Sequence, residues 1–395
     1  MSGGWQGHSD SPITRRGLAQ IDLLGGRFNA PDLLVSSDLD RAVRTAEAIG
    51  VVEPDPMWRE LDFGAWEGLT QRETRRRFAT ELEAMRSGLD FAPEGGERLS
   101  GFASRIQQAL DSVSARLSDG EEAIVVTHGG VIHGLVAAAL GVGDQRALAL
   151  PANTSATTIV LDGTRRPEVF VYNDASHLIA DTAPSHALPP PLPGRTVMLF
   201  RHAETEANRE HRWHGRGETP LTESGRIQAA DLAKTAMPLD HIAASPLSRA
   251  RDTAAPVAVA QDKTVRVFDG LAEIHFGAWE GMTVDEIRAV DEDAFNRIYE
   301  SGLDEARGST GETFGEAGER LAATVDEITA DTDADPIGLF THGGVARAYV
   351  TGLLGIGFAD RHGLPVLRNT ARSDIRIEPN RARLVSYNIA PHLET

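Results

Sequence analysis

The sequence contains no cysteine. Without thiols the chain cannot form disulfides, thiolate zinc sites or iron–sulfur clusters, and it has no cysteine nucleophile. It also lacks an apolar run of about 18 residues, the length that a membrane-spanning helix needs, and residues 1–25 hold no apolar signal segment. Positive charge is scarce: the sequence has 39 Lys and Arg against 58 Asp and Glu, so its net charge is −19. These absences predict a cytoplasmic protein that binds neither nucleic acid nor membranes.

The composition of the chain is otherwise that of a globular protein. Hydrophobic residues make up 41% of the 395 positions and charged residues 25%. A chain of this length exceeds what one hydrophobic core usually holds, so we expect two or more domains. The oligomeric state is left open by the sequence.

An internal repeat sets the organisation of the chain. The segment from Trp5 to Gly17 matches the segment from Trp213 to Gly225, at an offset of 208 residues (213 − 5). Further matches follow in the same order, with a slightly larger offset later on: 39–42 with 247–250, 63–70 with 276–283, and 127–131 with 341–345. Between the copies, residues 180–194 are rich in proline and lack periodicity, which is typical of an extended linker. We therefore predict a tandem duplication with one domain in residues 1–179 and a second in residues 195–395.

Short apolar runs alternate with longer amphipathic segments within the second copy. Residues 197–200, 242–244 and 337–340 are predicted strands, and residues 221–236 and 283–301 are predicted helices, the first capped by Thr222. Such alternation indicates an α/β fold with a mostly parallel sheet covered on both faces. Because reactive groups collect at the carboxyl ends of parallel strands, His202 and His342, which follow two of these strands, are expected at the same edge.

The polar residues near this edge are suited to phosphate chemistry. Two arginines can grip phosphate oxygens, and a neutral imidazole beside them can attack phosphorus. A carboxylic acid can protonate the leaving alcohol, and a second, positively charged histidine can stabilise the oxygens. No metal is needed for this chemistry. The second copy offers Arg201, His202, Asn208, Arg249, Glu273 and His342.

The segment from Leu199 to Asn208 resembles the Arg-His-Gly-Glu-Thr…Asn signature of the histidine phosphatase superfamily, the phosphoglycerate mutase-like fold. The family's other motifs follow in order over residues 195–395: 215–225, 245–254, 273–281, 311–313 and 341–344. The resemblance implies two phosphoglycerate mutase-like three-layer α/β/α domains with mostly parallel sheets. It also implies a histidine acid-type phosphatase without cofactors. The roles that it implies are His202 as phosphorylated nucleophile, Glu273 as proton donor, His342 as second histidine, and Arg201, Asn208 and Arg249 as phosphate ligands. One departure is Ala203, where the family usually has glycine.

The first copy departs further from the family. Arg41, Glu60 and His128 stand at the positions of Arg249, Glu273 and His342. The position equivalent to the nucleophile falls before Met1 (202 − 208 = −6), and the first strand is absent with it. Its loss is expected to leave unpaired backbone groups on the neighbouring strands. Two explanations stay open: the chain begins downstream of its natural start, which we favour, or this copy is a truncated, catalytically dead partner.

The sequence is compatible with three functions. The favoured one is a phosphomonoesterase that acts through a phosphohistidine on a small phosphorylated metabolite. The second is a phosphoglycerate mutase-type phosphotransferase, although Thr205-Glu-Ala-Asn208 and the compact copies favour the phosphatase. The third, for the first copy alone, is a non-catalytic phosphate-binding pseudo-phosphatase.

Overall fold

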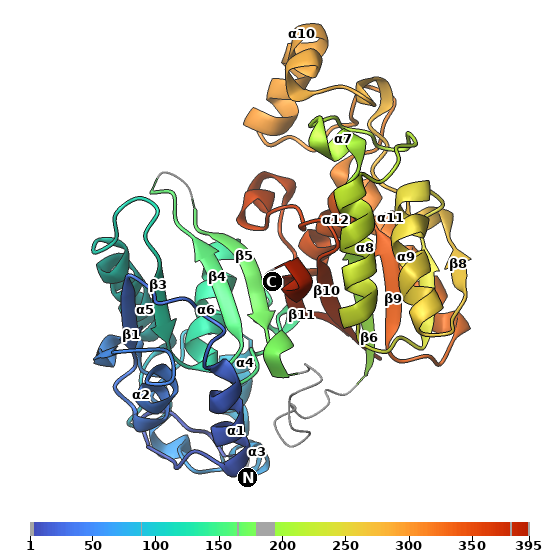
Figure 1. Ribbon diagram of the computed structural model, residues 1–395. Coiled ribbons are helices and arrows are strands. Elements are labelled where there is room, and N and C mark those ends of the chain that lie inside the picture. The colour runs from blue at the N-terminus through green and yellow to red at the C-terminus, as the bar shows by residue number, and fades with distance from the viewer. Residues whose placement is uncertain (1–3, 88, 164–165, 179–193, 380, 394–395) are drawn as a thin grey trace. The chain divides into compact units, whose positions relative to one another are not determined.

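The computed structural model describes residues 4–87, 89–163, 166–178, 194–379 and 381–393, and the predicted linker 180–194 lies outside them except for Gly194. The chain packs into two compact units, whose elements Figure 1 labels. Unit 1 comprises Met1–Ala139, Leu150–Thr157 and Ala175–Pro190, and unit 2 comprises Leu140–Ala149, Thr158–Asp174 and Pro191–Thr395. The units interleave along the chain, and domain bounds at residues 179 and 195 stay a prediction.

Unit 1 is built on a parallel sheet with the strand order β2-β1-β3, formed by β1 (Leu33–Ser36), β2 (Glu53–Pro54) and β3 (Ala123–Val126). Its helices are α1 (Arg15–Leu24), α2 (Asp40–Ala46), α3 (Gln71–Arg77), α4 (Ala79–Arg86), α5 (Leu99–Ser114) and α6 (Gly129–Leu140), whose last residue belongs to unit 2. The core packs Val35 of β1 and Val131 of α6 against Trp58 and Ile106. Within the described residues β3 is an edge strand and is only half-buried. That a missing first strand leaves unpaired backbone groups on β3 stays a prediction.

The sheet of unit 2 has the strand order β4-β5-β11-β10-β6-β9-β7-β8. Its strands are β4 (Ala156–Val160, with its first two residues in unit 1), β5 (Glu168–Asp174), β6 (Arg195–Arg201), β7 (His241–Ala244), β8 (Val265–Val267), β9 (Ile337–Thr341), β10 (Arg372–Glu378) and β11 (Arg381–Ile389). The strands β6, β9, β7 and β8 are parallel, whereas β10 runs antiparallel to β6 and β11 antiparallel to β10 and β5. The predicted mostly parallel sheet is therefore corrected to a mixed one, because β10 and β11 follow each other directly and pair as a hairpin.

Helices cover both faces of the parallel part of this sheet. The pair α8 (Glu223–Thr235) and α9 (Ser248–Ala260) lies on one face, and α11 (Phe314–Asp331) and α12 (Gly343–Leu353) lie on the other (Figure 1). The short α7 (Glu206–Arg209) and α10 (Val284–Phe295) complete the described helices of unit 2, together with single turns. The predicted strands and the first predicted helix are confirmed, including the N-cap of α8, where the Thr222 side chain accepts the Gly225 N–H. The helix predicted over residues 283–301 is corrected: α10 has non-helical dihedral angles at Asp291 and ends at Phe295, and a π-helical turn follows over Asn296–Glu300. No helix within the described ranges is long and apolar enough to cross a membrane.

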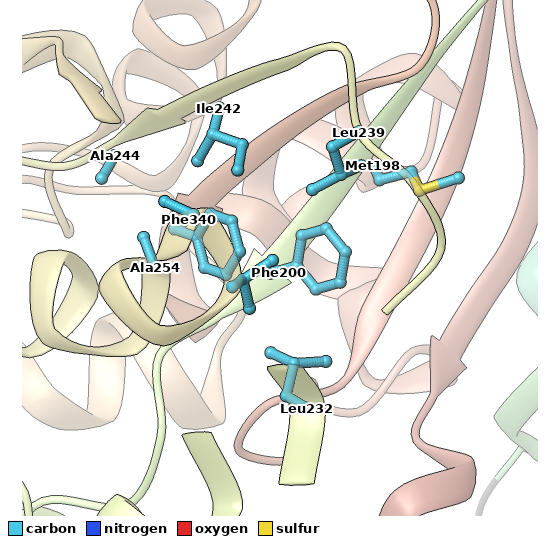
Figure 2. Packing of buried hydrophobic residues seen from close by; sticks show 10 residues of the cluster. Met198, Phe200, Leu232, Leu239, Ile242, Ala244, Ala254 and Phe340 are labelled. Atoms are coloured by element: carbon cyan, nitrogen blue, oxygen red, sulfur yellow. The ribbon is translucent and has the colours of Figure 1, made fainter. Parts of the chain in front are cut away.

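A hydrophobic core lies between the central strands and the helices α8 and α9. Phe200 of β6 and Phe340 of β9 stack with ring centroids 4.8 Å apart. Leu232 of α8 and Ala254 of α9 pack on these rings together with Ile242 of β7 (Figure 2). The strands β6, β9 and β7 are parallel neighbours in this sheet, so their carboxyl ends reach the same edge.

Candidate active site

Two histidines meet at the carboxyl edge of the unit 2 sheet. Arg201 of β6 pairs with Thr341 of β9, so His202 and His342 leave neighbouring strands at the same level. Their ring centroids lie 5.1 Å apart, with the ring planes at 60°. The two histidines that the sequence predicted at one edge are therefore in direct contact.

The contacts of His202 define which ring nitrogen is free. His202 is only 4% exposed, and its Nδ1 lies 2.7 Å from the carbonyl oxygen of Ala203. A carbonyl only accepts, so Nδ1 carries the hydrogen and Nε2 of the neutral ring keeps its lone pair. Burial, and next the charges of Arg249 and Arg201, lower the pKa of His202 well below its usual value. The ring is thus held in the neutral form that a nucleophile requires.

His342 is neutral as well, which differs from the cation that the sequence led us to expect. The Nε–H of Arg249 donates to His342 Nδ1 at 3.1 Å, so the hydrogen of this ring is on Nε2, which donates to Ser245 Oγ at 2.8 Å. Burial is the main cause that lowers the pKa of His342 well below its usual value, followed by Arg249. The positive charge of the site therefore comes from its arginines.

Both predicted arginines lie at this edge. Arg249, on the first turn of α9, is 2% exposed, and it donates from Nη1 to Gly217 O and from Nη2 to Gly215 O, both at 2.8 Å. Arg201 donates from Nη1 to Leu367 O at 2.5 Å, while its buried Nε has no partner. Burial lowers the pKa of Arg201 to about 10, which leaves it charged at neutral pH. Each guanidinium keeps N–H donors for an anion.

Glu273 is held against the first turn of α12. Its Oε1 accepts the N–H groups of Ile274 at 2.9 Å and Val345 at 2.8 Å, and its Oε2 accepts the Gly344 N–H at 3.0 Å. A Cβ at position 344 would lie 2.7 Å from Oε1, which explains the glycine. The charge of Glu273 acts on both Arg201 and Arg249, where it opposes the lowering of their pKa values. With one accepted bond, Oε2 keeps a lone pair that can bind a proton.

The backbone around Glu273 is braced by a residue that the sequence analysis missed. Arg320 of α11 donates from Nη1 to Gly270 O at 2.7 Å and to Ala272 O at 2.9 Å, and it pairs with Glu312 at 2.7 Å. In unit 1, Arg105 makes the same kind of pair with Glu97, also at 2.7 Å. The recurrence of Gly-Glu followed eight residues later by arginine was the available signal.

Asn208 lies on α7 and is tied to the nucleophile through Asn369. The Nδ2 of Asn369 donates to Asn208 Oδ1 at 3.1 Å and to the backbone oxygen of His202 at 3.0 Å. Asn369 was another missed residue, and the repeat carried its signal, because Asn153-Thr154 matches Asn369-Thr370 and both threonines have a φ of 59°. Asn208 is thus in place beside His202.

The alanine that replaces the family glycine fits its surroundings. The Ala203 side chain is fully buried and packs with Leu221 and Ala229. Its N–H donates to Thr253 Oγ1 at 2.9 Å. The methyl group therefore fills apolar space beside the nucleophile.

Unit 1 repeats part of this arrangement. Arg41 donates from Nη2 to Gly7 O at 2.8 Å and from Nη1 to Ser9 O at 2.9 Å, as Arg249 does with Gly215 and Gly217. His128 Nε2 lies 2.8 Å from Ser37 Oγ, matching His342 and Ser245. Three contacts of the complete site thus recur at the positions that the repeat predicts.

The carboxyl group also recurs in unit 1, where Glu60 stands at the position of Glu273. Glu60 Oε2 accepts the Gly130 N–H at 2.9 Å, and burial raises the pKa of Glu60. Burial likewise lowers the pKa of His128 to about 3. The sequence positions that would pair with Arg201, His202 and Asn208 precede residue 1. Unit 1 therefore combines one guanidinium with two groups whose neutral forms are favoured.

Comparison with known proteins decides the family. The sequence profile of the histidine phosphatase superfamily (branch 1) matches residues 1–175 and 197–390. The chain belongs to the histidine phosphatase superfamily.

Relatives within the superfamily include phosphatases and mutases. Glucosyl-3-phosphoglycerate phosphatase of Mycolicibacterium vanbaalenii is 34% identical over 174 residues, which are 41% of this chain and 75% of the relative. Phosphoserine phosphatase 1 of Hydrogenobacter thermophilus is 30% identical over 200 residues, which are 50% of this chain and 93% of the relative. "Probable phosphoglycerate mutase GpmB" of an Enterobacter species is 32% identical over 169 residues, which are 42% of this chain and 78% of the relative. A solved structure of mycobacterial glucosyl-3-phosphoglycerate phosphatase with VO3 is 29% identical, with a TM-score of 0.44 over 49% of this chain and 98% of the other.

Proposed function

We propose that the protein is a phosphomonoesterase that acts on small phosphorylated metabolites through a phosphohistidine on His202. The observation that carries this proposal is the free Nε2 of a neutral, buried His202 beside two guanidinium groups. Imidazole in this state can attack phosphorus, while Arg201 and Arg249 neutralise the phosphate oxygens. The named activities of the phosphatase relatives agree with this choice.

The reaction proceeds in two displacements. In the first, His202 Nε2 forms a bond to phosphorus, the bond between phosphorus and the ester oxygen breaks, and Glu273 gives its proton to the leaving alkoxide. In the second, water attacks phosphorus, returns a proton to Glu273 and releases inorganic phosphate from Nε2. Asn208 contacts an oxygen of the transferred group, and His342 positions the guanidinium of Arg249 beside that group, because its Nδ1 accepts the Arg249 Nε–H. This scheme requires no metal and no cofactor.

The organisation of the chain is part of the same proposal. We infer a tandem duplication of the phosphoglycerate mutase-like three-layer domain, with residues 195–395 as the active copy. The shared contacts of Arg41 and Arg249, and of His128 and His342, support it. Residues 1–179 are proposed as a copy that retains Arg41, Glu60 and His128 and is non-catalytic in the chain described here.

The second candidate is a mutase, which the named relative GpmB favours. The two candidates differ in what accepts the phosphoryl group, water or a second substrate hydroxyl. We expect the wild-type chain to release inorganic phosphate from p-nitrophenyl phosphate in the presence of EDTA and without any bisphosphorylated primer. A colorimetric phosphate assay measures this. Activity that requires a bisphosphorylated primer and releases no phosphate would establish the mutase instead.

The acid role of Glu273 is tested by its amide. Glu273→Gln is expected to lower kcat/KM about 100-fold for an alkyl phosphate but less than about tenfold for p-nitrophenyl phosphate, whose leaving group needs no proton. Glu60→Gln makes the same change at the repeated position of unit 1 and should leave both rates unaltered. Equal losses for the two substrates in Glu273→Gln would remove Glu273 from the acid role.

A further inference from the structure

The two copies end in the same short motif. An Asn-Thr pair precedes one strand, and a His-Leu pair follows the next strand along the chain. The members are Asn153, Thr154, His177 and Leu178 in the first copy and Asn369, Thr370, His392 and Leu393 in the second. The proposed reaction gives no role to the threonine and the histidine of this motif.

The second copy uses the motif to hold the backbone of the nucleophile. The N–H of Thr370 is shared between the carbonyl oxygens of Arg201 at 3.1 Å and His202 at 3.3 Å. The Nδ2 of Asn369 donates to the same His202 oxygen at 3.0 Å. The carbonyl oxygen of Ala371 accepts the Arg201 N–H at 3.0 Å. Three consecutive residues therefore hold the carboxyl end of β6, where the nucleophile leaves the sheet.

The peptide unit between His202 and Ala203 is held at both of its ends. Its carbonyl oxygen accepts from Thr370 and Asn369, and its N–H, that of Ala203, donates to Thr253 Oγ1 at 2.9 Å. The imidazole depends on this unit, because its Nδ1–H donates to the carbonyl oxygen of Ala203. A rotation of the peptide unit would move that acceptor and turn the free Nε2 away from phosphorus. The orientation of the nucleophile thus depends on the turn that precedes β10.

Thr370 makes these contacts in a strained conformation. Its φ is 59°, in the left-handed region that β-branched residues rarely adopt, and such strain persists only where the surroundings hold it. The buried hydroxyl donates to the carbonyl of Asn369 at 2.6 Å, so Oγ1 accepts the Nε2–H of His392, which lies 2.7 Å away. His392 lies in the turn Pro391–Leu393, and burial is the main cause that lowers its pKa to about 4. A neutral, buried histidine is therefore bonded to the strained residue.

The same pair is present in unit 1, where the direction of its hydrogen bond has independent support. Thr154 has a φ of 59°, donates to Asn153 O at 2.7 Å and lies 3.1 Å from His177 Nε2. The other ring nitrogen of His177, Nδ1, lies 2.7 Å from Arg27 Nη1. A guanidinium only donates, so Nδ1 is the acceptor and the ring hydrogen is on Nε2, directed at Thr154. The direction assigned to the pair in unit 2 agrees with this counterpart.

We propose that Thr370 and His392 are positioning residues for the nucleophile. His392 holds Thr370 in its left-handed conformation, and the N–H of Thr370 then holds the carbonyl oxygen of His202. The inference rests on the proposed function and deepens it, because it names residues that act through the backbone of His202 and not on the substrate. Breaking the pair should slow phosphoryl transfer and leave phosphate binding unchanged, since Arg201 and Arg249 keep their guanidinium donors.

Removal of either hydrogen-bonding group tests the proposal in the full chain. Thr370→Val keeps the shape of its side chain, and His392→Leu removes the ring. Each is expected to lower the single-turnover rate of phosphohistidine formation about tenfold, because the nucleophile loses its alignment, and to change the inhibition constant of inorganic phosphate less than about twofold. The double variant should be no slower than the single ones, because both substitutions break the same bond. Rapid quenching with ³²P-labelled p-nitrophenyl phosphate measures the rates.

Conservative and matched variants distinguish positioning from a general loss of stability. Thr370→Ser keeps the hydroxyl and His392→Gln supplies an amide N–H near the place of Nε2, so both should keep at least about half of the wild-type rate. His177→Leu breaks the equivalent pair in unit 1 and should lower the melting temperature, while the rate stays within about twofold of the wild type. Wild-type rates in folded Thr370→Val and His392→Leu would overturn the proposal.

Nitrogen NMR separates this inference from the phosphatase proposal. In protein labelled with ¹⁵N-histidine, the His202 ring should show a protonated Nδ1 and an unprotonated Nε2, and these signals are assigned by their loss in His202→Ala. In Thr370→Val and His392→Leu they should shift toward the average of the two tautomers. If the wild type neither releases phosphate nor carries label but this shift is present, the phosphatase proposal fails and the positioning role stands. Unchanged His202 signals in both variants would overturn the positioning role even in an active enzyme.

Discussion

His202→Ala is expected to lower kcat/KM for p-nitrophenyl phosphate by at least about 10⁴-fold, because the variant has no atom to accept the phosphoryl group. Nothing close by replaces it, since His342 directs its Nε2–H to Ser245 and has its Nδ1 occupied by Arg249. After rapid mixing with substrate and quenching, the wild type should carry phosphate that is labile in acid and stable in base, and His202→Ala should carry none. Scintillation counting of ³²P-labelled protein measures this.

The matched control for this substitution is His128→Ala. His128 holds the position of His342 in unit 1 and contacts Ser37 as His342 contacts Ser245. Because every residue proposed for the reaction lies in unit 2, this variant should keep wild-type rates and wild-type labelling. Equal hydrolysis by His202→Ala and the wild type would show that the nucleophile is assigned wrongly. A loss of activity in a folded His128→Ala would place part of the active site in unit 1.

Arg249→Gln is expected to have the second largest effect, on both activity and stability. The guanidinium donates hydrogen bonds to Gly215 O, Gly217 O and His342 Nδ1, and its positive charge is proposed to stabilise the phosphate oxygens. Its loss should lower kcat/KM about 10²–10³-fold, as the removal of one preorganised donor does elsewhere. It should also lower the free energy of unfolding by about 2–4 kcal/mol, because two buried carbonyl oxygens and a ring nitrogen lose charged donors.

Arg41→Gln separates these two effects. Arg41 makes the equivalent bonds to Gly7 and Ser9, so its loss should destabilise unit 1 while the rate of hydrolysis stays within about twofold of the wild type. Differential scanning calorimetry and phosphate release, measured on both variants, distinguish the outcomes. If Arg249→Gln retained full activity despite a lowered stability, Arg249 would be a structural residue and not a phosphate ligand.

The repeat allowed much of the site to be predicted from sequence. A residue that recurs at a matched position, such as Arg41 with Arg249, has been retained with its neighbours, and the contacts to two backbone carbonyls show why. Strand ends were predictable because apolar runs such as 197–200 end abruptly at charged residues. The same reasoning overlooked Asn369 and Arg320, although both recur in the repeat, because each acts on backbone atoms of a segment that is distant in sequence.

The order of residues along the chain was by itself sufficient to predict the α/β alternation, the repeat and the presence of His202 and His342 at one sheet edge, because parallel strands leave their carboxyl ends together. Only the tertiary structure decided the protonation of these rings and the mixed character of the sheet. His342 is neutral because it is buried and because Arg249, 93 residues away in sequence, donates to its Nδ1. The sheet is mixed because β10 pairs with β6 in the antiparallel sense across more than 170 residues of chain. Both outcomes depend on contacts between segments that are remote in sequence, which local periodicity and composition do not encode.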